Sequence, residues 1–312
     1  MDPTLRQLEY VVAISEHGSF GRAAEHCFVT QPALSAQIAQ LEKILSVQLF
    51  ERGRKVRPTA AGETLIVQAR KILGDVRELR ETARGQGEPL VGRIRLGVIP
   101  TVSPYLLPVI LPELRLRFPR LRLSLKEAMT RDLVASLHAG ELDVLLLALD
   151  VEMGPVEEAE VLDDPFLLVV PPGHPLQDKT QLRQDDLEGS RVLLLADGHC
   201  LRSHAIEACH LRPNKDADDF SASSLGTLMR LVEGGMGVTL LPEISVGAEA
   251  HKDLGMKVLR FASPEPKRRI GLVWRRNGAR KREYKLLAGT IRKLLQKQPR
   301  AQVADNGSRN GG

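Results

Sequence analysis

The 312-residue sequence predicts a helical N-terminal domain, a long helix leading out of it, and a larger C-terminal α/β domain. The first sixty residues carry helix-capping residues and apolar residues at helical spacing, with little strand pattern. From Gly92 onward, short alternating or wholly apolar runs typical of strands take turns with helical stretches. No run of about eighteen apolar residues occurs, so we expect no membrane-spanning helix.

The composition is that of a globular protein. Hydrophobic residues make up 43% of the chain and charged residues 27%, and the net charge of +5 mildly favours an anionic partner. The first residues lack the basic and then apolar layout of a secretory signal. Three cysteines do not suit a secreted disulfide scaffold, so we expect a cytoplasmic protein without a membrane partner.

Residues 1–58 predict three short helices. Asp2 can cap the first helix, and Thr30 can cap the third. Only a tight turn separates the second helix from the third, which is the layout of a helix-turn-helix. The third helix carries one apolar stripe, formed by Leu34, Ile38, Leu41 and Leu45.

The opposite face of the third helix suits contact with DNA. Small residues there allow a close approach to the groove floor, and Gln and Ser side chains can hydrogen bond to base edges. Residues 51–58 hold four basic residues around a glycine, which predicts a β-hairpin wing that neutralises phosphates. A three-helix module for protein interactions is the alternative. The residues expected at DNA are Gln31, Pro32, Ser35, Ala36 and Gln40 on the helix, and Arg52, Arg54, Lys55 and Arg57 on the wing.

Residues 59–89 predict a linker helix and a hinge. Thr59 can cap the helix, and residues 85–89 have the composition of a linker. Apolar residues recur alternately four and three apart, which favours a coiled-coil seam with a second copy of the chain. An amphipathic helix packed on its own domain is the alternative. The seam residues are Leu65, Ala69, Ile72, Val76, Leu79 and Ala83.

Residues 90–300 predict an α/β domain with parallel sheets. About two hundred residues is generous for one sheet, so we expect two lobes separated by a cleft. The polar, glycine-rich residues 301–312 cannot bury a core and are expected to be disordered. Expected strands cover residues 94–98, 121–125, 143–149, 166–170, 191–195, 238–241 and 269–274, and expected helices cover 105–118, the stretch after Thr130, and 224–233.

The loop around Cys200 is the candidate for chemistry. Cys200 follows an apolar strand that ends at Leu195, and ligands bind at the carboxyl ends of strands in open α/β sheets. A thiolate is favoured by neighbouring cations, such as His199 and Arg202, which are near in sequence, or by a helix N-terminus. We expect a helix to begin just after Cys200, because residues 201–208 are rich in helix formers and contain no glycine or proline. These residues alone leave three roles open for Cys200 and Cys209: redox chemistry, inert packing or metal binding. The spacing lacks the two-residue gap usual in zinc sites.

Several motifs resemble the DNA-binding head of LysR-type transcriptional regulators. They are FGRAA at 20–24, VTQPALSAQI at 29–38, LE at 41–42 and LFER at 49–52, with TAAG at 59–62 resembling the start of that family's linker helix. The resemblance extends over the chain except its tail. It implies a homodimer or homotetramer on double-stranded promoter DNA, with RNA polymerase as a further partner. It also implies a two-lobed effector domain similar to periplasmic binding proteins, with no enzymatic activity, no metal and no cofactor.

The effector domain resembles that of the family's hydrogen peroxide sensors, which activate oxidative-stress genes. The likeness rests on GHCLR at 198–202, the interval to Cys209, IPTV at 99–102, PYLLP at 104–108 and GVTLLP at 237–242. It implies that Cys200 is the peroxide-reactive cysteine and that Cys209 closes a disulfide with it. Three adjacent basic residues at 267–269 leave open which one faces the peroxide. The implied peroxide pocket consists of Thr101, Thr130, His199 and Arg268.

Two other functions fit the same sequence. One is a LysR-type regulator that responds to a small metabolite in the interlobe cleft, with incidental cysteines. The other is a thiol peroxidase fused to a DNA-binding head, which would need many turnovers with a reductant. Substitution of Cys200 separates the first from a peroxide sensor, since only the sensor needs the thiol.

Overall fold

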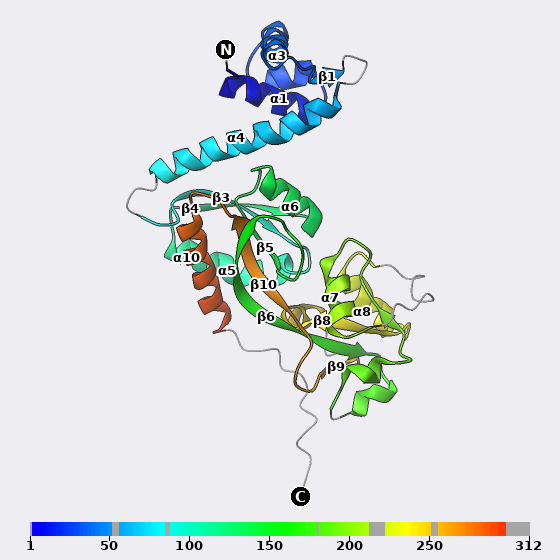
Figure 1. Ribbon diagram of the computed structural model, residues 1–312. Helices are drawn as coiled ribbons and strands as arrows, with labels where there is room; N and C mark the ends of the chain where they lie inside the picture. Colours follow the sequence, from blue (N-terminus) through cyan, green and yellow to red (C-terminus); the bar gives the residue numbers. More distant parts are fainter. Residues whose placement is uncertain are drawn as a thin grey trace, which may run out of the picture.

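The computed structural model describes residues 2–51, 56–84, 88–179, 181–211, 222–250 and 255–297. A helical N-terminal domain sits at one end of helix α4 (Ala60–Arg84), and a two-lobed C-terminal domain lies along the rest of the molecule (Figure 1). Separate hydrophobic cores fill the N-terminal domain and each lobe. None of the helices in the described ranges is long and apolar enough to cross a membrane. The predicted wing residues Arg52, Arg54 and Lys55 and the tail 301–312 lie outside the described residues.

Three helices form the N-terminal domain, and the second and third make the predicted helix-turn-helix. The turn between them contains Phe28, whose φ is +56° and whose side chain is 93% exposed. Thr30 caps the third helix as predicted, because its Oγ1 accepts a hydrogen bond from the backbone N of Ala33 at 3.4 Å. The helices are α1 (Leu5–His17), α2 (Phe20–His26) and α3 (Gln31–Leu45).

The first helix begins later than the sequence predicted. Thr4, and not Asp2, is its N-cap: Thr4 Oγ1 accepts from the backbone N of Gln7 at 3.2 Å, and the Gln7 side chain accepts from the backbone N of Thr4 at 3.0 Å. This reciprocal capping box satisfies two backbone donors at once, which outweighs a single acidic cap at Asp2.

The residues that flank positions 52–55 pair as two strands, as the predicted hairpin wing requires. Strand β1 (Phe50–Glu51) pairs antiparallel with β2 (Arg57–Pro58). Arg57 is exposed on the second strand. Thr59 then caps α4, since its Oγ1 accepts from the backbone N of Gly62 at 3.0 Å. The wing and the linker helix are therefore joined through a single capping residue.

The apolar residues of α4 divide between two faces. Ile66, Ala69 and Leu73 are buried within the chain, whereas Ile72 and Leu79 are 43% and 67% exposed. Ala69 therefore packs on its own chain and does not belong to an open seam. Ile72 and Leu79 remain available to a second copy, so the coiled-coil hypothesis keeps part of its predicted residues.

The two lobes of the C-terminal domain are built from discontinuous segments. Strand β6 (Val156–Val170) and strand β10 (Lys267–Arg275) run through their junction. The first lobe contains β3 (Gly92–Val98), α5 (Ser103–Arg117), β4 (Leu121–Glu127), α6 (Thr130–His138), β5 (Val144–Ala148) and α10 (Lys281–Leu295). The second lobe contains two 3-10 helices (Pro175–Asp178 and Gln184–Leu187), β7 (Val192–Leu193), α7 (Cys200–Ala208), α8 (Leu225–Glu233), β8 (Val238–Pro242), α9 (Glu243–Glu249) and β9 (Lys257–Arg260).

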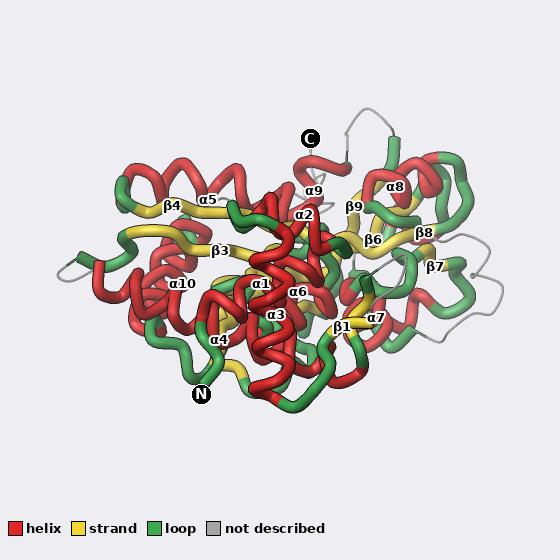
Figure 2. Tube along the Cα trace, turned by 90° about the horizontal axis from the view of Figure 1, so that it is seen from above, coloured by secondary structure: helices red, strands yellow, loops and turns green. Residues whose placement is uncertain are grey.

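The sheet joins the lobes through β6, and its strand order is β4-β3-β5-β10-β6-β8-β7, with β9 also paired to β6. The first part of β6 pairs with β10, and its last residues pair with β8 and β9. Seen from above, β3 and β4 lie towards one end of the molecule and β7 and β8 towards the other (Figure 2). The two-lobed α/β prediction is confirmed by this arrangement.

The expectation of parallel sheets holds only in part. Strands β3, β4 and β5 pair in parallel, as do β7 and β8, but β10 is antiparallel to both β5 and β6, and β6 is antiparallel to β8. The sequence showed only residues 166–170 of β6 as a strand, because the preceding stretch 156–165 is rich in acids. The strand that connects the lobes was therefore missed.

The second half of α4 docks closely on the first lobe. A Cβ on Gly74 would lie 3.1 Å from the Cα of Gly140, so the two backbones touch. Gly140 has a φ of +70°, a conformation that favours glycine. Beside this contact, the buried carboxylate of Glu78 accepts hydrogen bonds from the backbone N of Arg280 at 2.9 Å and from Arg275 at 3.4 Å. The linker helix and the first lobe are thus fixed to one another.

Candidate functional site

Helix α7 places Cys200 at the junction between the lobes. Leu201, Ala205 and Cys209 belong to the core of the second lobe, whereas the side chain of Cys200 packs against the core of the first. The preceding Gly198 has a φ of +95°, which turns the chain into the helix. The residue with the most reactive side chain in this segment therefore lies where the two lobes meet.

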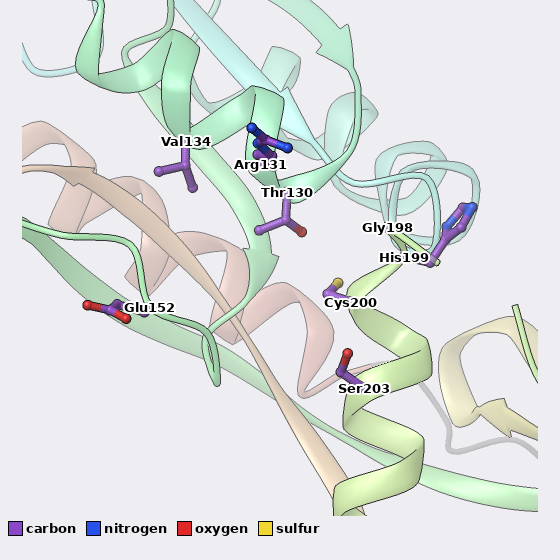
Figure 3. A pocket seen from close by; sticks show the side chains of 8 residues that line it. All are labelled: Thr130, Arg131, Val134, Glu152, Gly198, His199, Cys200 and Ser203. Carbon is purple, nitrogen blue, oxygen red and sulfur yellow. The ribbon is translucent and has the colours of Figure 1, made fainter. Parts of the chain in front are cut away.

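A pocket opens beside the Cys200 sulfur. Its inner part is lined by Ile99, Pro100, Thr101, Met129, Thr130, Gly198, His199 and Cys200. A wider recess of about 360 Å³ shares Thr130, Gly198, His199 and Cys200 and adds Arg131, Val134, Glu152 and Ser203. Figure 3 shows Thr130, from α6 of the first lobe, facing Cys200 on α7 of the second. The structure thus brings together four of the predicted site residues: Thr101, Thr130, His199 and Cys200.

Two buried polar atoms next to Cys200 have no hydrogen-bond partner within the described part of the chain. They are the Oγ1 of Thr130 and the Nδ1 of His204. A buried polar atom without a partner costs about 1–3 kcal/mol, so two of them at one sulfur need an explanation. A Cys200 thiolate would accept hydrogen bonds from both side chains. The unpaired atoms therefore suit an anion at this position.

The surroundings lower the pKa of Cys200 below its ordinary value. Burial opposes the charged thiolate, but the hydrogen bonds that His204 and Thr130 would donate to a thiolate outweigh it, and the charge of Arg268 contributes in the same direction. Cys200 is also the first residue of α7, where the helix dipole favours negative charge. Because the thiolate is the nucleophilic form of cysteine, Cys200 can react where an ordinary buried thiol cannot.

Of the two histidines near Cys200, His199 is the one that was predicted to line the pocket. His199 is buried and lines the pocket, and burial lowers its pKa, which favours a neutral ring. His204 lies one turn beyond Cys200 on α7 and is the histidine whose pKa is coupled to that of the thiol, and its four-residue separation from Cys200 was the available signal. Arg202, expected near the thiol, pairs with Asp197 at 3.1 Å.

Among the three basic residues at 267–269, Arg268 is the one whose side chain is buried. Lys267 and Arg269 point to the surface, with side chains 49% and 43% exposed. Arg268 pairs with Asp164 at 2.9 Å and donates to Thr101, both to its Oγ1 at 3.0 Å and to its carbonyl oxygen at 3.1 Å. Arg268 is not among the lining residues, so it acts on the pocket through Thr101 and through its charge.

Cys200 and Cys209 are both free thiols. Cys209 follows the last turn of α7 and is 1% exposed, and burial raises its pKa to about 12. Nine residues of helix span about 13 Å, whereas a disulfide needs Cα atoms within about 7 Å. The two cysteines cannot bond while α7 is intact. The described ranges contain no cluster of three His, Cys, Asp or Glu side chains placed to bind a metal ion.

The residues expected at DNA lie on one face of α3. Gln31, Pro32, Ala36 and Gln40 are exposed and Ser35 is half-buried. The opposite stripe points inward, because Leu34, Ile38 and Leu41 are buried in the domain core. The exposed aromatic ring of Phe28 at the start of this face was not singled out from the sequence.

Comparison with known proteins gives consistent matches over nearly the whole chain. Residues 5–63 match the bacterial regulatory helix-turn-helix protein, lysR family, and residues 87–296 match the LysR substrate binding domain. The chain is 44% identical over 293 residues to the hydrogen peroxide-inducible genes activator of Pectobacterium carotovorum, covering 94% of this chain and 97% of that protein.

Solved structures of OxyR are similar to this chain over most of its length. Full-length OxyR of Pseudomonas aeruginosa, with a cysteine replaced by aspartate, has a TM-score of 0.76 at 34% identity, covering 93% of this chain and 98% of that one. A hydrogen peroxide-bound cysteine-to-serine mutant of Corynebacterium glutamicum OxyR has a TM-score of 0.67 at 35% identity, covering 95% and 94%.

Proposed function

The chain belongs to the LysR family of bacterial helix-turn-helix regulators, and on that premise we propose that it controls promoters in response to hydrogen peroxide, which it senses through Cys200. The observation that carries this proposal is the half-buried thiol of lowered pKa beside a pocket whose Thr130 hydroxyl lacks a partner in the described structure. Two relatives support the same ligand: one is named a hydrogen peroxide-inducible genes activator, and the other is an OxyR structure with hydrogen peroxide bound.

The pocket suits the cleavage of a peroxide bond. The Cys200 thiolate attacks one oxygen, the O–O bond breaks, and negative charge builds on the departing oxygen. Hydroxyl groups at Thr101 and Thr130 and the cation of Arg268 behind Thr101 would stabilise that charge. The sulfur becomes a sulfenic acid and the departing hydroxide is protonated to water. Cys209 then attacks the Cys200 sulfur, which forms the disulfide and releases a second water.

Oxidation would reach the DNA through changes in α7 and the lobe junction. A regulator needs only one oxidation per signal, whereas a peroxidase must turn over many times. We infer that the chain works as a homodimer or homotetramer, to which the exposed Ile72 and Leu79 of α4 contribute. Promoter DNA would meet the exposed face of α3 and the wing, and RNA polymerase would be the further partner of the bound regulator.

Peptide mapping before and after mild peroxide treatment tests the proposed sensor. We expect the full chain to gain a linkage between the peptides that contain Cys200 and Cys209, and the Cys200→Ser variant to lose both this linkage and any change in promoter binding. Cys27→Ala is the matched control, because Cys27 is buried in the N-terminal core and should leave the response intact. A Cys200→Ser variant that still responds in vivo would favour a metabolite sensor.

The wing predicts a salt-dependent affinity for DNA. Replacing Arg54 and Lys55 together with Ala should flatten the slope of log K against log salt by about one unit per lost phosphate contact. Arg57→Ala should act in the same direction, since its side chain is exposed on β2. Fluorescence anisotropy at several salt concentrations measures the slope. Arg282→Ala, an exposed cation on α10, should leave it unchanged. An unaltered slope in the wing variants would exclude the wing from the interface.

A further inference from the structure

His204 lies one turn after Cys200 on the same face of α7 and is 4% exposed. Its Nε2 lies 3.2 Å from the backbone carbonyl oxygen of Asp150. A carbonyl oxygen can only accept, so Nε2 carries the hydrogen and Nδ1 of the neutral ring is left as an acceptor. This Nδ1 is buried and has no hydrogen-bond partner among the described residues. The first lobe thereby fixes the tautomer that presents a basic nitrogen to the thiol.

We propose that His204 is the base that activates Cys200: its Nδ1 takes the thiol proton and holds the resulting thiolate as an imidazolium–thiolate pair. The inference rests on the peroxide-sensing function proposed above, but it concerns the thiol before any peroxide arrives. Thr130 would complete the pair by donating its otherwise unpartnered hydroxyl to the same sulfur.

Electrostatics around the pair favour its charged form. Burial disfavours the imidazolium, yet the hydrogen bond and charge of the Cys200 thiolate raise the pKa of His204, while the pKa of Cys200 is lowered. Arg268 favours the thiolate and opposes the imidazolium, and its own charge is paired with the buried Asp164. The titratable and charged groups around the pair are Arg268 and Arg269 of β10, Asp164 of β6, Asp150 and Glu152 after β5, Arg131 of α6, and His199 before α7.

The reaction balances with His204 as the proton carrier. The thiol proton moves to Nδ1, and the thiolate attacks a peroxide oxygen. As the O–O bond breaks, the departing hydroxide takes the proton back from His204. The sulfur is oxidised by two electrons to the sulfenic acid, the peroxide is reduced by two electrons, one water forms, and His204 returns to the neutral ring.

Two substitutions distinguish the roles of the two ring nitrogens of His204. His204→Gln places a neutral amide near the position of Nε2, where it can still donate to the Asp150 carbonyl, but it removes the basic nitrogen. His204→Asn places a neutral amide near the position of Nδ1 and loses the bond to Asp150. His210→Gln is the matched control, because His210 is exposed just beyond α7.

The test is the rate at which iodoacetamide alkylates Cys200 in the full chain, followed by mass spectrometry across a range of pH without peroxide. In both variants we expect alkylation near neutral pH to fall about tenfold, with the rate recovering at higher pH as the thiol ionises without help. A merely structural role for His204 would not move this pH profile. Peroxide oxidation should slow in parallel, and His210→Gln should match the parent in both assays.

The outcomes distinguish this inference from the proposed function. A folded His204→Gln or His204→Asn variant with the parent's alkylation profile would overturn the role of His204, even if peroxide still oxidises Cys200. A parent chain whose Cys200 alkylates readily at neutral pH but resists peroxide would instead overturn the sensing function. Thermal melting of each variant shows which of them are folded.

Discussion

Mild peroxide treatment of the full chain should abolish the protection of helix α7 against amide hydrogen exchange. The segment from Cys200 to Cys209 is helical in the reduced chain and spans about 13 Å, so a disulfide within about 7 Å requires the helix to unwind. Unwinding also breaks the bond between His204 and Asp150, which holds α7 to the first lobe. Hydrogen exchange followed by mass spectrometry should show residues 201–208 exchanging orders of magnitude faster after oxidation.

The Cys209→Ser variant separates oxidation from unwinding. Its Cys200 should still be oxidised, while α7 keeps its protection because no second thiol is present to close the disulfide. Ordinary helical protection in the disulfide form of the parent would contradict the prediction. So would equal loss of protection in the Cys209→Ser variant, because oxidation of Cys200 would then suffice.

Arg268→Ala should lower the free energy of unfolding by about 3–5 kcal/mol, one of the largest effects available in the C-terminal domain. Arg268 and Asp164 are both 0% exposed and pair at 2.9 Å, so removing the guanidinium leaves a buried carboxylate without its partner. The loss of two hydrogen bonds to Thr101 adds to the cost. Slow peroxide oxidation in this variant would therefore mix a chemical effect with a structural one. Urea unfolding measures the stability.

The neighbouring Arg269 provides the control for this prediction. Its side chain is 43% exposed and pairs with Asp150 at 2.7 Å, so Arg269→Ala should cost no more than about 1 kcal/mol. Replacing the buried pair together, as Arg268→Met with Asp164→Leu, should recover much of the stability because no unpaired charge remains. Equal stability of the Arg268→Ala and Arg269→Ala variants would refute the buried-pair argument.

Local patterns in the sequence predicted the helical parts of this molecule well. Thr30 and Thr59 cap helices as expected, and the run between the cysteines forms α7 because it holds helix formers without glycine or proline. The pairing of β1 with β2 was also readable, from the basic residues around a glycine that separate them in the sequence. These features depend on neighbours in sequence, which a single chain displays directly.

Features that depend on distant segments were missed. The acidic first part of β6 is a strand because β10 pairs with it, which no local pattern reveals. His204 differs from His199 because the carbonyl of Asp150, from the other lobe, fixes its ring. The resemblance named Arg268 but left open which residue of 267–269 turns inward, and Arg268 is buried because Asp164 and Thr101 converge on it from segments far apart in the chain. In each case a partner from another element decides the role of the residue.

The close contact between Gly74 and Gly140 fixes the middle of α4 to the first lobe, so the N-terminal part of the helix should move when that lobe turns. Fourteen residues separate Gly74 from the start of α4 at Ala60, a length of about 21 Å along the helix axis. If the first lobe turns by about 10°, the attached end of the helix sweeps through roughly 4 Å, close to the spacing of about 3.4 Å between successive bases on a DNA strand. A side chain at Gly74 would press on the backbone of Gly140 and loosen this contact. The two glycines thus allow the close contact that couples α4 to the first lobe, and the length of α4 sets how far a rotation of that lobe would displace the N-terminal domain.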